Sequence, residues 1–284
     1  DAGEGVSLSN GTRVKSWTSR VGGLRFNALT ARSQPVLVPG VLNGKPVLHF
    51  NGQNNVLRGE QKLKLDGSVS AFFVTYNRMV PEGSMHKILF AGAGDPYRAG
   101  GTSYGWGYLR GSSGFNLSMG NDVLEQKISY TIPPHDRFEL ISLVVDKGMT
   151  RIWRNGEAKA NGTLTRQSGY APEAYVVGGS VATRSFYGAI AEIIVYSNAL
   201  GESERLEVVD ALRLKYGSFD EAPVFSRPRS GAPAAPSATG WYVQPGVSPE
   251  QAPKNEDWVA LEYLGPPADS LNPEETLPTS GAQY

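Results

Sequence analysis

Apolar and polar residues alternate along several short segments of this chain. Each segment is bounded by Gly, Asn, Asp or Pro, residues that favour turns over regular structure. An alternation with a period of two places every second side chain on the same face of an extended strand. We therefore expect β-strands at 46–51, 70–78, 87–92, 138–147, 149–156, 174–179 and 188–197.

Two short turn sequences predict how three of these strands are connected. Asp-Lys-Gly at 146–148 ends one hairpin, and Asn-Gly at 155–156 ends the next. A tight type I′ turn needs positive φ angles at both central residues, and Asn-Gly adopts them at low cost. Residues 138–160 are therefore predicted to form a three-stranded antiparallel meander.

One segment, 202–216, follows a helical pattern instead. Its apolar residues recur at three- and four-residue spacing and form one stripe: Leu206, Val209, Leu212 and Tyr216. Gly201 stands at the N-cap position, Glu204 can accept hydrogen bonds from the free amides there, and Gly217 suits the left-handed residue after the helix. Because a lone amphipathic helix must bury its stripe, we expect this helix to cover the sheet like a lid.

The composition changes after residue 217. Eleven of the nineteen prolines lie between Pro223 and Pro278. Segment 218–284 holds three Lys or Arg against nine Asp or Glu, so its net charge is −6 and residues 1–217 carry +6. A proline-rich segment of this kind runs extended or as polyproline II. We therefore divide the chain into a β domain, 1–217, and an extended acidic tail, 218–284.

Apolar residues interrupt this tail in clusters, which solvated linkers lack. We expect these clusters to anchor the tail on a partner protein, with both indoles largely buried. The predicted anchors are Trp241, Tyr242, Trp258, Leu261 and Tyr263.

Composition narrows the class of protein. The 284 residues include no cysteine, which excludes disulfides and thiolate metal sites. No apolar run approaches the roughly 20 residues that a membrane-spanning helix needs. The formal net charge is zero, so no overall field attracts nucleic acid. The chain starts at Asp1 rather than Met, as a chain does after removal of a signal peptide. We therefore expect a secreted, periplasmic or cell-surface protein of bacterial origin.

Two blocks of sequence carry a family resemblance. The first, 14–57, runs from VKSW to NNVL, and the second, 186–217, is FYGAIAEIIVYSNALGESERLEVVDALRLKYG. With these blocks, and VVDKGMTRIWRNGE at 144–157, residues 1–217 resemble bacterial laminin-G-like domains of the concanavalin-A-like lectin/glucanase superfamily. The resemblance implies a two-sheet antiparallel jelly-roll sandwich with one C-terminal lid helix. It implies no reaction, because such folds host many functions.

The predicted strands lack the acid pair that hydrolysis of polysaccharides requires. Such enzymes place two carboxylates across a cleft, usually two residues apart on one strand face. Glu192 is the only acid in 188–197, and Glu139 is the only acid in 138–145. The three histidines fall on different segments and share no metal-ligand spacing. We therefore expect a domain without catalytic activity.

The resemblance also suggests a calcium site, although no cofactor is required for a binding role. Sandwich domains of this type often bind one Ca²⁺ at the sheet edge, through carbonyls of a Gly turn and an acid of the closing strand. Gly52 and Glu192 occupy comparable positions. Phe-Asn-Gly at 50–52 replaces the Asp-bearing turn usual in the family, so the alternative of a plain turn and a solvated Glu192 is favoured.

Aromatic and cationic residues concentrate in 95–111, DPYRAGGTSYGWGYLRG. Aromatic faces and planar hydrogen-bonding groups suit both sugars and protein partners. The candidate ligand-binding residues are Tyr97, Arg98, Tyr104, Trp106, Tyr108 and Arg110. The competing interpretation is that Trp106 and Tyr108 alternate inward along a strand as core residues.

Two functions fit these observations. The first, which also explains the tail, is a non-catalytic accessory subunit that docks on other protein chains of an envelope or extracellular assembly through its sandwich and tail. The alternative is a carbohydrate-binding, lectin-like module that recognises a polysaccharide, with Ca²⁺ as a possible aid.

Overall fold

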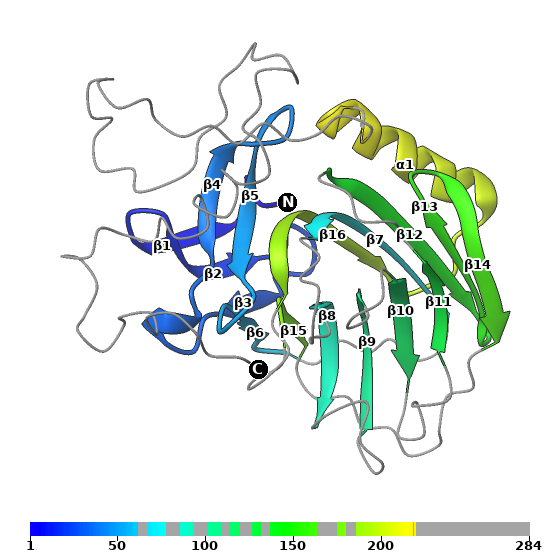
Figure 1. Ribbon diagram of the computed structural model, residues 1–284, viewed down its shortest axis with the longest axis horizontal. Coiled ribbons are helices and arrows are strands. Elements are labelled where there is room, and N and C mark those ends of the chain that lie inside the picture. Colours follow the sequence, from blue (N-terminus) through cyan, green and yellow to red (C-terminus); the bar gives the residue numbers. More distant parts are fainter. Residues whose placement is uncertain are drawn as a thin grey trace.

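The computed structural model describes residues 1–61, 68–77, 86–93, 102–108, 114–119, 127–131, 137–163, 175–179, 186–217 and Phe219. Within these residues the chain is almost entirely antiparallel β-sheet, with one α-helix, α1 (Glu202–Tyr216), and one short 3₁₀ helix, η1 (Ala31–Ser33) (Figure 1). The strands are β1 (Val6–Asn10), β2 (Arg13–Thr18), β3 (Arg25–Asn27), β4 (Val36–Gly40), β5 (Gly44–Asn51), β6 (Leu57–Gly59), β7 (Val69–Asn77), β8 (His86–Ala93), β9 (Thr102–Tyr108), β10 (Gly114–Met119), β11 (Lys127–Thr131), β12 (Glu139–Asp146), β13 (Met149–Arg154), β14 (Glu157–Thr163), β15 (Val176–Val177) and β16 (Tyr187–Tyr196).

Every segment that the alternation marked as a strand coincides with one, namely β5, β7, β8, β12, β13, β15 and β16. The expected meander is also confirmed, because β12 pairs with β13 and β13 with β14. At the second turn Asn155 and Gly156 have φ angles of 51° and 88°, as a type I′ turn requires. The helix has the predicted limits.

All the strands belong to one hydrogen-bonded sheet. Along the sheet they follow the order β11-β10-β9-β8-β15-β6-β3-β2-β4-β5-β16-β7-β12-β13-β14, and β1 pairs with β2. The two arms of this path meet at β2 and β4, which share a single residue pair, Arg13 with Val36. The described strands thus form one continuous sheet, and the connection of two separate sheets as a jelly roll stays a prediction.

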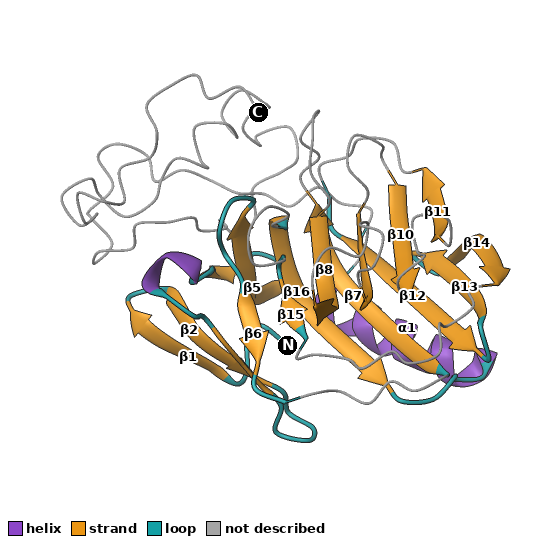
Figure 2. Cartoon of the chain, turned by 90° about the horizontal axis from the view of Figure 1, so that it is seen from below, coloured by secondary structure: helices purple, strands orange, loops and turns teal. Residues whose placement is uncertain are grey.

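One hydrophobic cluster packs residues of both arms together. Trp17 of β2 and Val177 of β15 come from one arm, and Phe73, Ile141 and Ile152 come from the other. The outer ends of the arms also approach each other, since a Cβ added to Gly162 of β14 would lie 3.1 Å from the Ile128 side chain of β11. The sheet therefore folds over its own core, as Figure 2 shows.

Helix α1 covers a second cluster on the other side of the β7–β12 region (Figures 1 and 2). Val209, Leu212 and Tyr216 pack there with sheet residues such as Phe72 and Leu140. Burial of the helix stripe is what makes a lone helix of this length stable. The expectation of a lid helix is therefore confirmed.

The N-terminal end of the buried stripe differs from the expectation. Leu206 is 39% exposed, and Arg205 is buried in its place at 1% exposure. The guanidinium carbon of Arg205 lies 4.2 Å from the centroid of the Trp153 ring, and its Nε and Nη2 donate to the Glu202 carboxylate at 3.0 and 2.5 Å. The prediction for Leu206 was wrong because an arginine can bury its stem while an aromatic face and a carboxylate accept its charge.

This contact predicts a dependence of stability on pH. The hydrogen bond from Arg205 lowers the pKa of the Glu202 carboxyl below its usual 4.5. A lowered carboxyl pKa contributes stability above the unfolded value, and this contribution is lost as the pH falls through the folded value. Because Glu202 is exposed, Glu202→Gln should cost no more than about 1 kcal/mol at pH 7. Urea unfolding at pH 7 and pH 3 would measure the loss, which should be smaller at pH 3; an equal loss at both values would contradict the assignment.

The predicted tail, 218–284, lies outside the described residues except for Phe219. Its five proposed anchors therefore stay predictions: Trp241, Tyr242, Trp258, Leu261 and Tyr263. Phe219 itself is buried in the cluster under α1. Among the described residues no helix has the length and apolar character needed to cross a bilayer.

Candidate functional site

Only half of the candidate ligand-binding residues fall on described backbone. Tyr104, Trp106 and Tyr108 occupy alternate positions of β9, where Trp106 pairs with Leu117 of β10. The remaining three, Tyr97, Arg98 and Arg110, lie outside the described residues. A ligand site formed by all six stays a prediction, and so does the competing core interpretation.

The two candidate calcium ligands are separated along one strand. Gly52 follows Asn51, which pairs with Tyr187 at the start of β16, and Gly52 donates its backbone N–H to the Phe186 carbonyl at 3.0 Å. Glu192 lies five positions beyond Tyr187 on β16, which corresponds to roughly 16 Å of extended strand. The structure thus places the two residues at different points of the sheet. Calcium binding stays a prediction.

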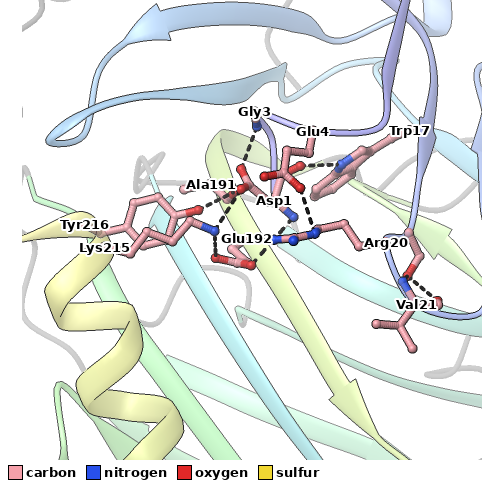
Figure 3. Close-up of polar contacts among 11 residues, drawn as sticks. Asp1, Gly3, Glu4, Trp17, Arg20, Val21, Ala191, Glu192, Lys215 and Tyr216 are labelled. Atoms are coloured by element: carbon pink, nitrogen blue, oxygen red, sulfur yellow. Dashed lines mark hydrogen bonds and ion pairs between the residues drawn. The ribbon is translucent and has the colours of Figure 1, made fainter.

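The Glu192 carboxylate already lies among cationic groups (Figure 3). Lys215 Nζ donates to Glu192 Oε2 at 2.9 Å, and the Asp1 amino group lies 3.8 Å from Oε1. Lys215 also pairs with the Asp1 carboxylate at 2.8 Å. Burial lowers the pKa of the Asp1 amino group to about 6, although the nearby Glu192 charge acts in the opposite direction. This cluster ties the first residues and the end of α1 to β16.

A second polar region is a cleft of about 780 Å³ between the β13–β14 hairpin and α1, which we call the hairpin–helix cleft. In Figure 1, α1 lies alongside these strands. The residues that line the cleft are Arg154, Asn155, Gly156, Glu157, Lys159, Leu206, Arg213, Gly217 and Phe219. Among them are three cationic side chains and one carboxylate. The lining of the cleft is therefore mainly polar and charged.

The turn at the edge of the cleft is fixed from both sides. Asn155 exchanges two hydrogen bonds with Leu140, because its backbone N–H donates to the Leu140 carbonyl at 2.8 Å and its Oδ1 accepts from the Leu140 N–H at 2.9 Å. Arg213 Nη2 donates to the Asn155 carbonyl at 2.6 Å. A Cβ on Gly156 would lie 2.7 Å from Arg213 Nη2, so glycine lets the guanidinium rest on the turn. The sheet and the helix thus hold the cleft in one shape.

The three cations of the cleft differ in how strongly they are neutralised. Arg154 Nε donates to the fully buried Glu139 carboxylate at 2.6 Å. Lys159 Nζ donates to the exposed Glu157 carboxylate at 2.6 Å and lowers the pKa of that carboxyl. Among the described residues, the carboxylate paired with Arg213 is that of Asp210, at 3.6 Å, and Asp210 is itself largely exposed. Arg213 and Lys159 are therefore the cations that a ligand can reach.

Sequence reasoning predicted the hairpin but not this cleft. The alternation of Glu157 and Lys159 after the Asn-Gly turn indicates one polar strand face, which was a signal available from the sequence. The opposite wall comes from Leu206 and Arg213 of α1, and Leu206 had been assigned to the core. In the described part of the chain no group of three or more His, Cys, Asp or Glu is arranged to hold a metal ion.

Comparisons with known proteins give a likeness of fold. No family model matches this sequence, and no curated protein matches it. Trypanosoma rangeli sialidase in complex with 2,3-difluoro-KDN superposes with a TM-score of 0.52 and 13% identity, covering 75% of this chain and 33% of the sialidase chain. The Ruminococcus gnavus IT-sialidase CBM40 bound to α2,3-sialyllactose gives a TM-score of 0.40 and 15% identity, covering 50% of this chain and 83% of the module.

This chain thus spans about a third of the T. rangeli sialidase chain that it matches. At 13% identity, this similarity concerns the fold alone. It shows that the described chain shares a mostly β architecture with a part of that protein, and membership of the laminin-G-like family stays a prediction.

Proposed function

We propose that this chain is a non-catalytic carbohydrate-binding module and that its ligand binds in the hairpin–helix cleft. The observation that carries the proposal is the cleft itself, whose walls are fixed by the Asn155–Leu140 and Arg213–Asn155 hydrogen bonds. Small-molecule sites are usually preformed hollows with a few polar groups that set orientation. The sequence favoured an accessory subunit and gave a carbohydrate-binding module as the alternative, whereas we now favour the carbohydrate-binding module.

The groups in the cleft match the chemistry of a sugar. Each sugar hydroxyl can both donate and accept a hydrogen bond. Arg213 and Lys159 supply charged donors, and Glu157 supplies a charged acceptor. Leu206, 39% exposed, offers an apolar surface to the C–H groups of a ring. Donors, an acceptor and one apolar contact therefore line the same hollow.

The carboxylates of this region support a binding role over hydrolysis. Glycoside hydrolysis needs two carboxyl groups, one of them an acid with a raised pKa. Glu139 is buried against Arg154, and Lys159 lowers the pKa of the Glu157 carboxyl. Neither has the environment of a general acid. We therefore propose that the cleft binds a sugar without cleaving it.

We propose that binding needs no metal ion. The support is the Glu192 cluster, in which Lys215 already pairs with the carboxylate that calcium would use. Ligand binding should accordingly be unchanged by EDTA. A loss of binding in EDTA that Ca²⁺ restores would instead favour the calcium-assisted form of the function.

The remaining expectations from the sequence are kept as proposals. They are a jelly-roll connection of the strands, a tail at 218–284 that docks on other protein chains, and a location outside the cytoplasm, where polysaccharides are met. The tail proposal rests on composition, and it is compatible with a carbohydrate site on the β domain.

The test is a glycan array followed by calorimetry on the full chain. The double variant Lys159→Ala/Arg213→Ala removes the two reachable charged donors and should weaken binding of every array ligand at least about tenfold, because a hydrogen bond to a charged group contributes about 1.5–3 kcal/mol. The matched control is Lys15→Ala/Arg20→Ala, which removes two exposed cations outside the cleft. No glycan binding by the native chain, or equal binding by the cleft variant, would refute the proposal.

A further inference from the structure

The geometry points to an acidic sugar as the ligand of the hairpin–helix cleft, with its carboxylate bound by Arg213 and Lys159 and with Glu157 as a competing carboxylate built into the site. This inference rests on the proposed carbohydrate-binding function and specifies its ligand class. Its first basis is that a ligand can reach two of the cations that line the cleft, Lys159 and Arg213.

Arg213 is the cation best placed to bind a carboxylate. Its side chain is 46% exposed, and its hydrogen bond to the described part of the chain goes to a neutral carbonyl, that of Asn155. Its ion pair with Asp210 spans 3.6 Å, and Asp210 is 72% exposed, so the attraction is screened by water. The planar guanidinium therefore keeps N–H groups for a carboxylate, which it can bind through two parallel hydrogen bonds.

Lys159 adds a second charge whose present partner can be exchanged. Glu157 is 76% exposed and holds Lys159 at 2.6 Å across a flexible surface pair. Exposed pairs of this kind contribute little net stability. The carboxylate of a ligand can take the place of Glu157 on Lys159, and Glu157 can turn into solvent. Glu157 thus lowers the affinity for acidic ligands without being needed for them.

Arg154 has a different role although it lines the same cleft. Its guanidinium is committed to the Glu139 carboxylate, which is fully buried. Removing that partnership would leave a buried charge uncompensated, so Arg154 is structural. The cations that select the ligand are the two that it can reach, Lys159 and Arg213. Both line the same cleft as one partly exposed apolar side chain, Leu206, which favours a sugar ring that carries a carboxylate.

The experiment compares each acid with its own neutral ester. Trigalacturonate, α2,3-sialyllactose and the most strongly bound acidic glycan of the array are titrated into the full chain by calorimetry, each alongside its methyl ester. The ester keeps the ring and hydroxyl groups and removes only the charge. At least one acid should bind about tenfold more tightly than its ester, because a charged hydrogen bond is about twice as strong as a neutral one. This preference should shrink between 50 and 500 mM NaCl.

Three substitutions test which residues cause the preference for the acid over its ester. Arg213→Ala should weaken binding of both ligands and should reduce the preference for the acid over the ester about tenfold, whereas Arg213→Lys should restore part of that preference because it keeps the charge but not the planar fork. Glu157→Gln should strengthen acid binding about threefold, since it removes the competing carboxylate. A gain cannot come from misfolding. Arg20→Gln, which removes an exposed charge from the ion pair with Glu4 outside the cleft, should change neither ligand.

Other results of these titrations would contradict the acidic-sugar inference, the carbohydrate-binding function or both. Equal binding of acid and ester, or array binding confined to neutral glycans, overturns the acidic-sugar inference while the carbohydrate function stands. No binding to any glycan overturns both. Oligoglutamate that binds as tightly as the best acid and responds to the same variants would identify an acidic-peptide site and overturn the inference. If Glu157→Gln does not increase the affinity for the acid, Glu157 does not compete with the ligand.

Discussion

Replacing Arg154 by Met should lower the free energy of unfolding by about 3–5 kcal/mol, because it leaves a carboxylate buried without its cation. Glu139, the first residue of β12, has no exposed surface, and its Oε2 accepts from Arg154 Nε at 2.6 Å. The methionine keeps much of the arginine stem and removes only the charged end. The loss therefore reports the uncompensated charge rather than a cavity.

Two further variants distinguish the loss of the Glu139–Arg154 ion pair from the general effect of replacing an arginine on this strand. Glu139→Gln/Arg154→Met removes both charges and should recover a substantial part of the loss, since neutral replacements of a buried pair cost far less than breaking it. Arg151→Met changes an exposed arginine of the same strand and should cost less than about 1 kcal/mol. Denaturant unfolding followed by tryptophan fluorescence measures all three. A loss below about 1 kcal/mol for Arg154→Met would show that water reaches Glu139.

Local sequence rules predicted those parts of the fold that depend on neighbouring residues. The Asn-Gly turn at 155–156 predicted the hairpin of β13 with β14 and the positive φ angles of its own two residues. The register that the turn sets holds only to Trp153, where the pairing shifts by one residue. β7 was also predicted, from alternation, although all nine of its residues are buried and neither face of the strand is exposed. The limits of α1 followed from the glycines at both ends.

Features that depend on contacts between distant segments could not be predicted. Arg205 looks like a solvent-facing residue in the sequence, and it is buried because Trp153 of β13 lies beneath it. The cleft escaped prediction for the same reason, since Arg213 and Asn155 are 58 positions apart. The continuous sheet depends on the pairing of β2 with β4, which involves one residue pair and leaves no periodic signal.

The position of the helix stripe can be tested by a matched pair of substitutions on α1. Leu212 is 3% exposed and packs in the cluster under the helix, whereas Leu206 is 39% exposed at the cleft. Leu212→Ala should therefore destabilise the domain by about 2–5 kcal/mol, the usual cost of removing a buried leucine side chain together with the cavity left behind.

Leu206→Ala makes the same chemical change on the same helix and should cost less than about 1 kcal/mol, since most surface substitutions have small effects. Both variants alter helix propensity equally, because each exchanges leucine for alanine inside α1. Their difference in denaturant midpoint at constant slope thus measures burial alone. Equal losses of 2 kcal/mol or more would place Leu206 in the core, as the sequence pattern first indicated, and would remove it from the wall of the cleft.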